Sequence, residues 1–380
     1  MASAAPARHV HIEALQTALP TRAVEPGRAR PVSVAAAAPL PAAALQRRAR
    51  VVLYYRAVAA ADAPAPWSQE EALLVKESLS EAVADHPEMA GRLRRPRADG
   101  SGGSSWEVKL NDTGVRLVLA TVEAAVDDFV GAGVSEEDRE RREAALAPWT
   151  HVDADDPDMC ALCFVQLTRF QGDGGYAVGV SCGLMLCDPL SLARFLLSWA
   201  RTHAAMKARN KVATIPMMQY TGYFQRPNTM TRRIKSVPLD AFAADAGGGT
   251  ETALFRASGA PDHRALARAC VDEASDRLGA AANKVSRLSL LVVARDGVGD
   301  NPRGMSVETC TADSLPVPGG SSGNKPEVAQ WQDLGLEEFA LRESKPVHVS
   351  CSIVTGGDEE GLVVVMPDGK GFLVTVTVPK

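Results

Sequence analysis

The segment from Met159 to Trp199 restricts the possible fold more than any other part of the chain. Two runs of apolar and β-branched residues, Met159 to Phe170 and Tyr176 to Leu186, flank Gly172-Asp173-Gly174-Gly175, which is typical of a hairpin turn. A helix is expected after Asp188-Pro189, because apolar residues recur there at helical spacing. These residues are Leu192, Phe195, Leu196 and Trp199. The segment therefore predicts paired strands covered by a helix.

Other parts of the chain also predict a mixture of strands and helices. A strand at Val51 to Tyr55 precedes a helix that should end near His86-Pro87, because a residue before proline avoids helical backbone. Further along, a helix is expected from about Asp262 to Leu278 and a strand from Leu288 to Ala294. We expect an antiparallel meander of the last three strands, at Val347 to Val354, Leu362 to Met366 and Phe372 to Val378. The fold class is therefore α/β, mixed and two-layered.

The length of the chain, 380 residues, favours two lobes over a single small core. Residues 204–250 show no periodicity and contain Gly247-Gly248-Gly249, so we expect a crossover linker there. An N-terminal lobe is expected at residues 1–203 and a shorter C-terminal lobe at 251–380. We expect two similar lobes, each a mixed β-sheet with flanking helices.

Charge and composition exclude several functional classes. The net charge is −5 and the isoelectric point about 5.9, which argues against nucleic acid as a partner, because its binding requires a basic surface. The N-terminal residues lack the apolar core of a signal peptide, and no apolar run approaches the ~20 residues that span a bilayer. We therefore expect a cytoplasmic protein without a transmembrane segment. Its seven scattered cysteines are expected to be reduced thiols.

Several stretches of the sequence resemble one plant enzyme family. Pro87 to Arg94 has the form P-x-x-A-G-R-L-R, and Asn111 to Val115 has the form N-D-x-G-V. Lys345-Pro346 resembles the beginning of the family's C-terminal end. The family's central segment, S-x-x-H-x-x-x-D-G-x-S-x-x-x-F-x-x-x-W-A, is matched at Ser181, Asp188, Ser191, Phe195, Trp199 and Ala200. The chain thus resembles the BAHD acyltransferases, which implies their two-lobed, chloramphenicol-acetyltransferase-like architecture.

The sequence departs from this family at its defining motifs. The resemblance assigns the catalytic histidine of H-x-x-x-D-G to Leu184, the aspartate to Asp188 and the glycine to Pro189. The D-F-G-W-G motif is replaced by Ala-Leu-Arg-Glu-Ser at residues 340–344. In the family, the histidine is the general base that deprotonates the acceptor as it attacks an acyl-CoA thioester. Leucine has no lone pair, and general-base assistance is worth roughly 10²–10⁴ in rate, so we predict a degenerate, non-catalytic member.

The resemblance is closest to the Eceriferum/Glossy-type branch, whose members also lack D-F-G-W-G. That branch implies an accessory role in very-long-chain fatty-acid elongation for cuticular wax, beside a 3-ketoacyl-CoA synthase at the cytosolic face of the endoplasmic reticulum. No cofactor is required for this role, and acyl-CoA is implied as a ligand or substrate. One alternative is a residual CoA-dependent acyltransferase acting on an amine or alcohol, and another is a regulatory protein without an acyl ligand. The sequence therefore leaves open whether the protein is an enzyme.

Individual candidate residues have competing interpretations. Asp188 fits a helix N-cap with Pro189 at the first helical position, so we expect a structural role. Cys182 should share a strand face with Leu184, but no histidine lies nearby in sequence to activate a thiol. Cys160-Ala161-Leu162-Cys163 lies within a predicted strand, which favours core packing over a metal site. His348, on the polar face of its predicted strand, is a candidate for a substitute base if that face lines the tunnel, but a histidine in such a position is more often solvated.

Overall fold

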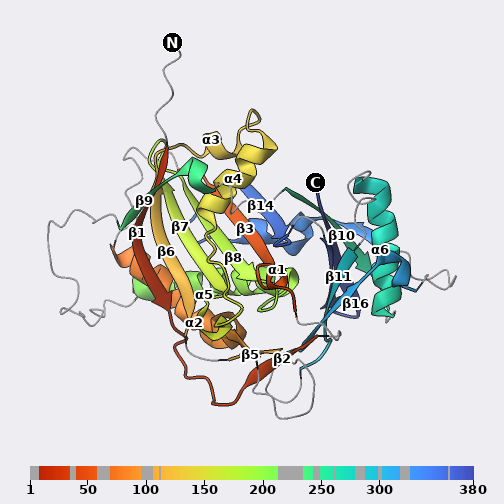
Figure 1. The fold of residues 1–380 in the computed structure, drawn as a ribbon. Helices are drawn as coiled ribbons and strands as arrows, with labels where there is room; N and C mark the ends of the chain where they lie inside the picture. The colour runs from red at the N-terminus through yellow and green to blue at the C-terminus, as the bar shows by residue number, and fades with distance from the viewer. Residues whose placement is uncertain are drawn as a thin grey trace.

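The computed structural model describes residues 8–34, 40–57, 69–95, 106–110, 113–212, 234–242, 249–259, 262–278, 287–297, 302–316, 326–357 and 360–380. Within these residues, the strands form two mixed sheets with helices against them (Figure 1). The first sheet has the order β14–β3–β8–β7–β6–β1–β9. In that order, its strands are His348–Val354, Arg48–Tyr55, Tyr176–Gly183, Cys163–Phe170, Val115–Val122, His9–Ala18 and Lys235–Pro238.

The second sheet contains nine strands among the described residues, in the order β13–β10–β16–β15–β11–β12–β2–β5–β4. In that order, they are Glu327–Ala329, Thr250–Ala257, Gly371–Pro379, Glu360–Asp368, Arg287–Val293, Met305–Cys310, Ala29–Val34, Trp106–Lys109 and Arg92–Arg94. Parallel pairing joins β6 to β7 in the first sheet, and β11 to β15 and β12 to β2 in the second. The other neighbours are antiparallel. Together with the helices, these mixed sheets confirm the predicted mixed α/β class.

Three hydrophobic clusters hold the layers together. The largest contains buried side chains of α2 and α5 and of both sheets, so one core is continuous between the two sheets. A second cluster lies between the opposite face of the seven-stranded sheet and α3 and α4, and a third lies under α6. The α-helices are α1 (Ala42–Leu45), α2 (Gln69–Asp85), α3 (Asp127–Val130), α4 (Glu136–Leu146), α5 (Pro189–Val212) and α6 (His263–Leu278). Short 3₁₀ helices include η1 (Pro87–Ala90), η3 (Leu239–Phe242), η6 (Trp331–Leu334) and η7 (Leu336–Glu338).

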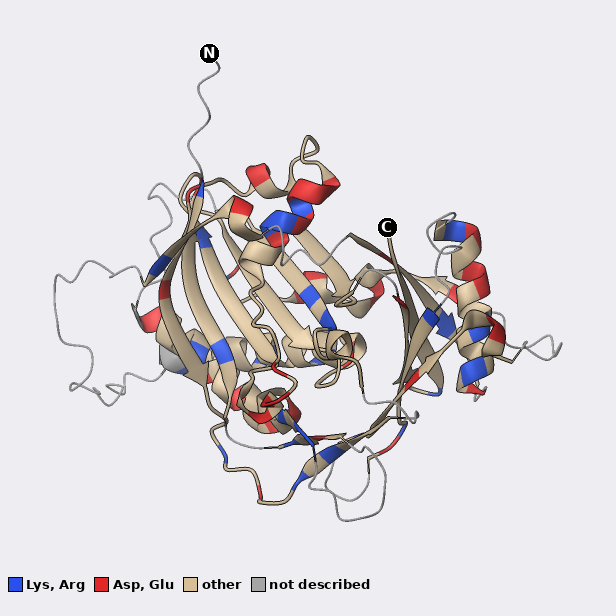
Figure 2. Cartoon of the chain, in the orientation of Figure 1, with Lys and Arg blue, Asp and Glu red and all other residues tan. Residues whose placement is uncertain are grey.

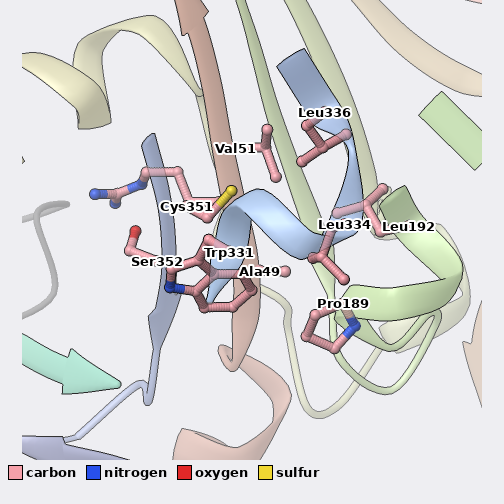
Figure 3. Close-up of a pocket in the computed structure, with 10 residues that line it drawn as sticks. Ala49, Val51, Pro189, Leu192, Trp331, Leu334, Leu336, Cys351 and Ser352 are labelled. Carbon is pink, nitrogen blue, oxygen red and sulfur yellow. The ribbon is translucent and has the colours of Figure 1, made fainter. Parts of the chain in front are cut away.

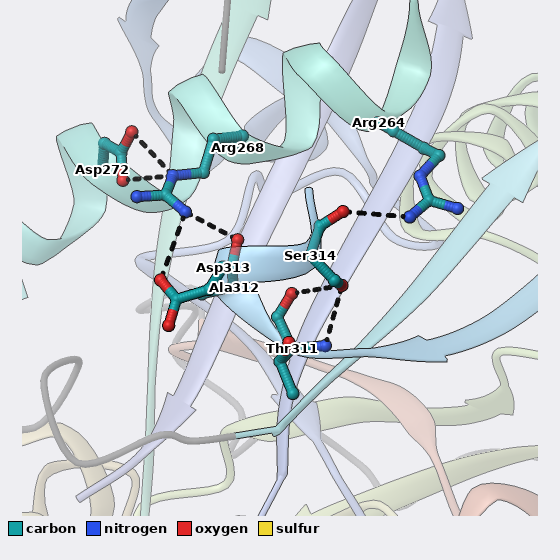
Figure 4. A network of polar contacts seen from close by, with 7 residues as sticks. All are labelled: Arg264, Arg268, Asp272, Thr311, Ala312, Asp313 and Ser314. Atoms are coloured by element: carbon teal, nitrogen blue, oxygen red, sulfur yellow. Dashed lines mark hydrogen bonds and ion pairs between the residues drawn. The ribbon is translucent and has the colours of Figure 1, made fainter. Parts of the chain in front are cut away.

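Charged side chains gather on α4 and α6, whereas the strands of the seven-stranded sheet are mostly uncharged (Figure 2). On α6, Arg268 donates from Nη1 to the carbonyl oxygen of Ala312 (2.6 Å), and its Nε contacts the carboxylate of Asp272 (2.9 Å; Figure 4). Arg264 reaches the carbonyl oxygen of Ser314 at 3.3 Å. Exposed pairs of this kind contribute at most about 1 kcal/mol each. The apolar face of α6 therefore provides most of the attachment.

The expected meander of the last three strands is wrong in its first member. β15 and β16 form the expected hairpin, with Asp368 opposite Gly371. β14, however, pairs with β3 of the other sheet, with His348 opposite Tyr54 at one end. An alternating pattern indicates a strand but does not say which edge the strand will join. Conversely, β2, β4 and β5 belong to the second sheet, so each sheet takes strands from both parts of the sequence.

The segment expected as a linker, residues 204–250, contains regular structure in its described parts. The helix α5 continues to Val212, and β9 and η3 occupy 235–242. Residues 213–233 and 243–248 of this segment lie outside the described part of the chain. β9 pairs with β1 and forms an edge of the seven-stranded sheet. Across the described ranges, every helix is too short or too polar to cross a membrane.

Candidate active site

The segment that the family resemblance singles out forms a tight turn between β8 and α5. The predicted strand from Tyr176 to Leu186 is too long, because β8 ends at Gly183. The carbonyl oxygen of Gly183 accepts hydrogen bonds from the backbone nitrogens of Leu186 (2.8 Å) and Cys187 (3.0 Å). The backbone nitrogen of Leu184 donates to the carbonyl oxygen of Arg47 (2.9 Å). The turn is therefore fixed by its own backbone and by the residue that precedes β3.

The side chain of Leu184 has no exposed surface (0%) and belongs to the core that runs between the two sheets. Its neighbours Met185, Leu186 and Cys187 are buried in the same core. A general base must reach the proton that it removes, directly or through one water molecule. Position 184 has neither a proton-accepting atom nor contact with solvent.

Asp188 caps α5, as its sequence position predicted. One carboxylate oxygen accepts from the backbone nitrogen of Ser191 (2.9 Å), and the other accepts from the hydroxyl of Ser191 (2.6 Å). Pro189 is the first residue of the helix, where the missing N–H costs no hydrogen bond. Both carboxylate oxygens therefore accept hydrogen bonds from the first turn of α5.

Two buried arginines, Arg30 and Arg47, contact this turn, Arg30 through its side chain and Arg47 through its backbone carbonyl. Neither was singled out from the sequence. Arg30 of β2 donates from Nη1 to the carbonyl oxygen of Leu186 (2.7 Å). Arg47 donates to Ser289 (2.8 Å) and to the carboxylate of Glu360 (2.9 Å). Burial lowers the pKa of Arg47, and the neighbouring Glu360 opposes that shift. Arg30 therefore connects the turn to β2, and Arg47 connects the start of β3 to β11 and β15 of the second sheet.

The only signal for these contacts in the sequence was the presence of arginines next to apolar residues. Arg30 precedes Pro31 and Val32 on β2, and Arg47 directly precedes the fully buried strand β3. A buried cation requires hydrogen-bonding partners. The partners themselves, however, lie far away along the chain, 156 residues from Arg30 and 313 residues from Arg47.

The thiols near the turn are buried and form a cluster. Cys182 of β8 lies directly opposite Cys163 of β7. Hydrogen bonding with Cys163 and Cys187, together with burial, raises the pKa of the Cys182 thiol. Because the thiolate is the reactive form, Cys182 is a poor nucleophile. Within the described residues, no group of three or more histidine, cysteine or acidic side chains is arranged to hold a metal ion.

Two local predictions about these cysteines are wrong because β7 and β8 are shorter than expected. Leu184 follows the end of β8, so it does not share a strand face with Cys182. Cys160 precedes β7, which begins at Cys163, so the two thiols of the C-x-x-C sequence do not alternate along one strand. The apolar runs continued past the strand ends because the turns are themselves buried in the core.

His348 lies far from the turn. His348 pairs with Tyr54 of β3. The backbone nitrogen of Leu184, in contrast, donates to the carbonyl oxygen of Arg47, seven residues before Tyr54 in the sequence. At ~3.3 Å per residue, this separation is roughly 23 Å. His348 also shares the sheet face of Tyr54, whose ring lies 5.8 Å from the imidazole, and that face packs toward α4. Burial, followed by the charge of Arg139, lowers the pKa of His348.

The segment in the place of D-F-G-W-G packs against β8 of the first sheet and against α2. Arg342 donates to Glu71 of α2 (2.9 Å) and stacks over the ring of Tyr176 of β8, 5.6 Å from its centroid. Leu341 is buried. Just before it, the ring of Phe339 contacts that of Trp199 of α5, with centroids 5.3 Å apart. These contacts attach the segment to α2, β8 and α5.

A small apolar pocket lies beside the turn, between the start of α5, β3, β14 and η6 (Figure 3). Its lining includes Pro189, Leu192, Trp331, Leu334 and Cys351, and Leu184 is not part of it. The cavity volume of about 10 Å³ is enough for a single water molecule. The pocket therefore offers no room for an acyl chain in this conformation.

Comparison with known proteins identifies the family to which this chain belongs. Residues 48–254, just over half of the chain, match the model of the transferase family. The chain is 31% identical over 248 residues to tryptamine benzoyltransferase 2 of Oryza sativa subsp. japonica, covering 64% of the chain and 45% of the relative. It is 27% identical over 168 residues to the hydroxycinnamoyl-CoA:piscidic acid hydroxycinnamoyltransferase of Actaea racemosa, covering 44% and 34%.

The chain belongs to this transferase family, within the BAHD acyltransferase superfamily. The matched segments span between a third and a half of the length of these two relatives. Among solved structures, the chain is similar to the crystal structure of vinorine synthase, with a TM-score of 0.47 and 15% identity. That alignment covers 98% of this chain and 95% of the other.

Proposed function

We propose that this protein is a BAHD-type protein that does not carry out histidine-dependent acyl transfer. The observation that carries the proposal is Leu184, a fully buried aliphatic side chain at the position that the family resemblance assigns to the catalytic histidine. Asp188, the partly matching second motif residue, is engaged by Ser191 in capping a helix. His348 and Cys182, the two substitutes considered, do not supply a base at the turn, since one is distant and the other is a protonated, buried thiol.

We further propose an accessory role for the protein in very-long-chain fatty-acid elongation for cuticular wax. The proposed partner is a 3-ketoacyl-CoA synthase at the cytosolic face of the endoplasmic reticulum, with acyl-CoA as the ligand that the family binds. This finer assignment is supported by the resemblance to the Eceriferum/Glossy-type branch.

The accessory role is tested by co-expression in yeast with individual plant 3-ketoacyl-CoA synthases. The readout is the distribution of acyl-chain lengths, combined with a pull-down of the synthase by the tagged protein. We expect a shift to longer chains and capture of the synthase, unchanged by Leu184→Met, which preserves the core. Unchanged chain lengths together with no capture would refute the accessory role.

A second candidate function is residual acyl transfer from acyl-CoA to an amine or alcohol. The relatives favour it, because they are named for benzoyl transfer to tryptamine and hydroxycinnamoyl transfer. Its test is turnover of benzoyl-CoA and hydroxycinnamoyl-CoA with amines, comparing wild type with Leu184→His. Turnover by wild type would support residual transfer. Activity that appears only after histidine is restored would exclude it, and would show that the lost base was the missing element.

A further inference from the structure

A second group of residues with nucleophilic chemistry lies at an edge of the seven-stranded sheet, separated from β8 by β7 and β6. His11 of β1 lies between Ser236 of β9 and Glu123, which follows β6. Its Nδ1 is 2.8 Å from the Ser236 hydroxyl oxygen, and its Nε2 is 2.9 Å from a carboxylate oxygen of Glu123. A carboxylate can only accept a hydrogen bond, so Nε2 carries the ring proton. In a neutral ring, Nδ1 then accepts the proton of the Ser236 hydroxyl.

The strand register explains why these side chains meet. His11 is directly opposite Ser236 in the antiparallel pair of β1 and β9. The backbone nitrogen of Leu239 donates to the carbonyl of Arg8, so by alternation His11 and Ser236 form a pair without backbone hydrogen bonds, where side chains are closest. The N–H of Ser236 then points to the outer side of β9, which is an edge strand. Within the described residues, no strand lies on this side of β9, so the N–H can donate to an oxyanion on the attacked carbonyl group.

The base is held in place while the nucleophile is accessible. His11 is buried, with 3% of its surface exposed, and Ser236 is exposed. The ring of His9 stacks on that of His11, with centroids 6.1 Å apart and 8° between the planes. Nδ1 of His9 also lies 3.9 Å from the second carboxylate oxygen of Glu123. A nucleophile next to a base that a third group orients is the arrangement of acyl-transfer sites.

We propose that Ser236 is a nucleophile for small activated esters and thioesters, with His11 as its general base and Glu123 as a positioning residue. The Ser236 oxygen attacks the carbonyl carbon, and its proton moves to Nδ1 of His11. The bond to the alcohol or thiol breaks with its electron pair, and His11 returns the proton to that leaving group. Water then attacks the acyl-serine ester and gives a proton to His11, which passes it to the departing Ser236 oxygen. The net reaction is hydrolysis to an acid and an alcohol or thiol.

The experiment uses the full chain, a fluorophosphonate probe and p-nitrophenyl acetate. We expect covalent labelling at Ser236, located by peptide mass spectrometry, and measurable hydrolysis of the ester. Ser236→Ala should abolish the label and lower the hydrolysis rate at least about tenfold, because general-base catalysis is worth roughly 10²–10⁴. Ser33→Ala, at an exposed serine of β2, is the matched control and should behave as wild type.

Two further variants separate the chemistry from folding. His11→Gln keeps a donor toward Glu123 but removes the base, so labelling should slow without a change in circular dichroism. If this buried variant does not fold, Glu123→Gln decides, because its partly exposed side chain can be changed with little effect on folding and should alter the pH profile of labelling. A label located elsewhere, or hydrolysis by Ser236→Ala at the wild-type rate, would overturn the proposal.

Discussion

The turn at 184–188 and the sheet edge at His11 contrast in almost every physical respect. At the turn, the side chains are apolar, and the arginines and Asp188 are engaged in structural hydrogen bonds. At the edge, a buried histidine connects an exposed serine to a carboxylate. The comparison teaches that the family's fold can be retained when the position assigned to its chemistry has become part of the hydrophobic core. Substitutions at the turn should therefore affect stability, and those at the edge should affect reactivity.

The largest stability loss is expected for Arg47→Met. It removes a buried cation from Glu360 and Ser289, and breaking a buried ion pair typically costs about 3–5 kcal/mol. Urea denaturation measures the loss. The control is Arg287→Met, because Arg287 also contacts Glu360 (3.2 Å) but is largely exposed, and this change should cost less than about 1 kcal/mol. Equal losses in the two variants would contradict the importance of burial.

Leu184→Ala should destabilise the protein by about 3 kcal/mol, because it leaves a cavity in a closed core. Leu184→Met, which preserves volume, should cost less than about 1.5 kcal/mol. Thermal and urea unfolding of both variants provide the measurement. If Leu184→Ala were neutral, residue 184 would border an open channel, and the contrast between the turn and the edge would fail.

Asp188→Ala should cost about 1 kcal/mol, the usual value for loss of a helix N-cap. Asp188→Asn keeps a capping oxygen and should lower the free energy of unfolding by only about 0.3 kcal/mol. A loss of acyltransferase turnover without a loss of stability, in a preparation that shows turnover, would instead place Asp188 in a reaction.

The buried His203 provides a pH-dependent test of the interior. Its Nδ1 is 2.9 Å from the hydroxyl oxygen of Ser78, and burial lowers its pKa. Below the normal pKa of histidine, the unfolded chain therefore binds more protons than the folded chain. The contribution of the neutral, buried His203 to stability is complete above a pH of about 6.5 and is lost as the pH falls toward the folded-state pKa. The free energy of unfolding should thus decrease on acidification below this pH. His203→Gln should flatten the dependence, and an unchanged slope in the variant would contradict this assignment.

The smallest stability effect is expected at the sheet edge. Ser236→Ala changes an exposed side chain and should alter the free energy of unfolding by less than about 0.5 kcal/mol. Its effect on fluorophosphonate labelling should nevertheless be complete. A large loss of stability would mean that the hydrogen bond to His11 mainly anchors β9 to the sheet.

Local sequence signals predicted local structure well and long-range structure poorly. Asp188-Pro189 predicted a cap that the structure confirms, and alternation predicted the β15–β16 hairpin. The pairing of β14 with β3 was not predictable, because these two strands lie far apart in the sequence. For the same reason, the sequence did not predict the contact between His11 and Ser236, which are 225 residues apart. Buried turns also lengthened the predicted strands, since hydrophobicity continues through them.

The position of β14 has a consequence for synthesis of the protein. A ribosome produces β3 early, but the strand that covers its outer edge is completed only at Val354. Until then, a strand that is buried in the complete fold presents an open row of hydrogen-bonding groups, which is a hazard for aggregation. Nascent chains shorter than this point should therefore depend on chaperones, and yield on expression should fall sharply for chains truncated before β14.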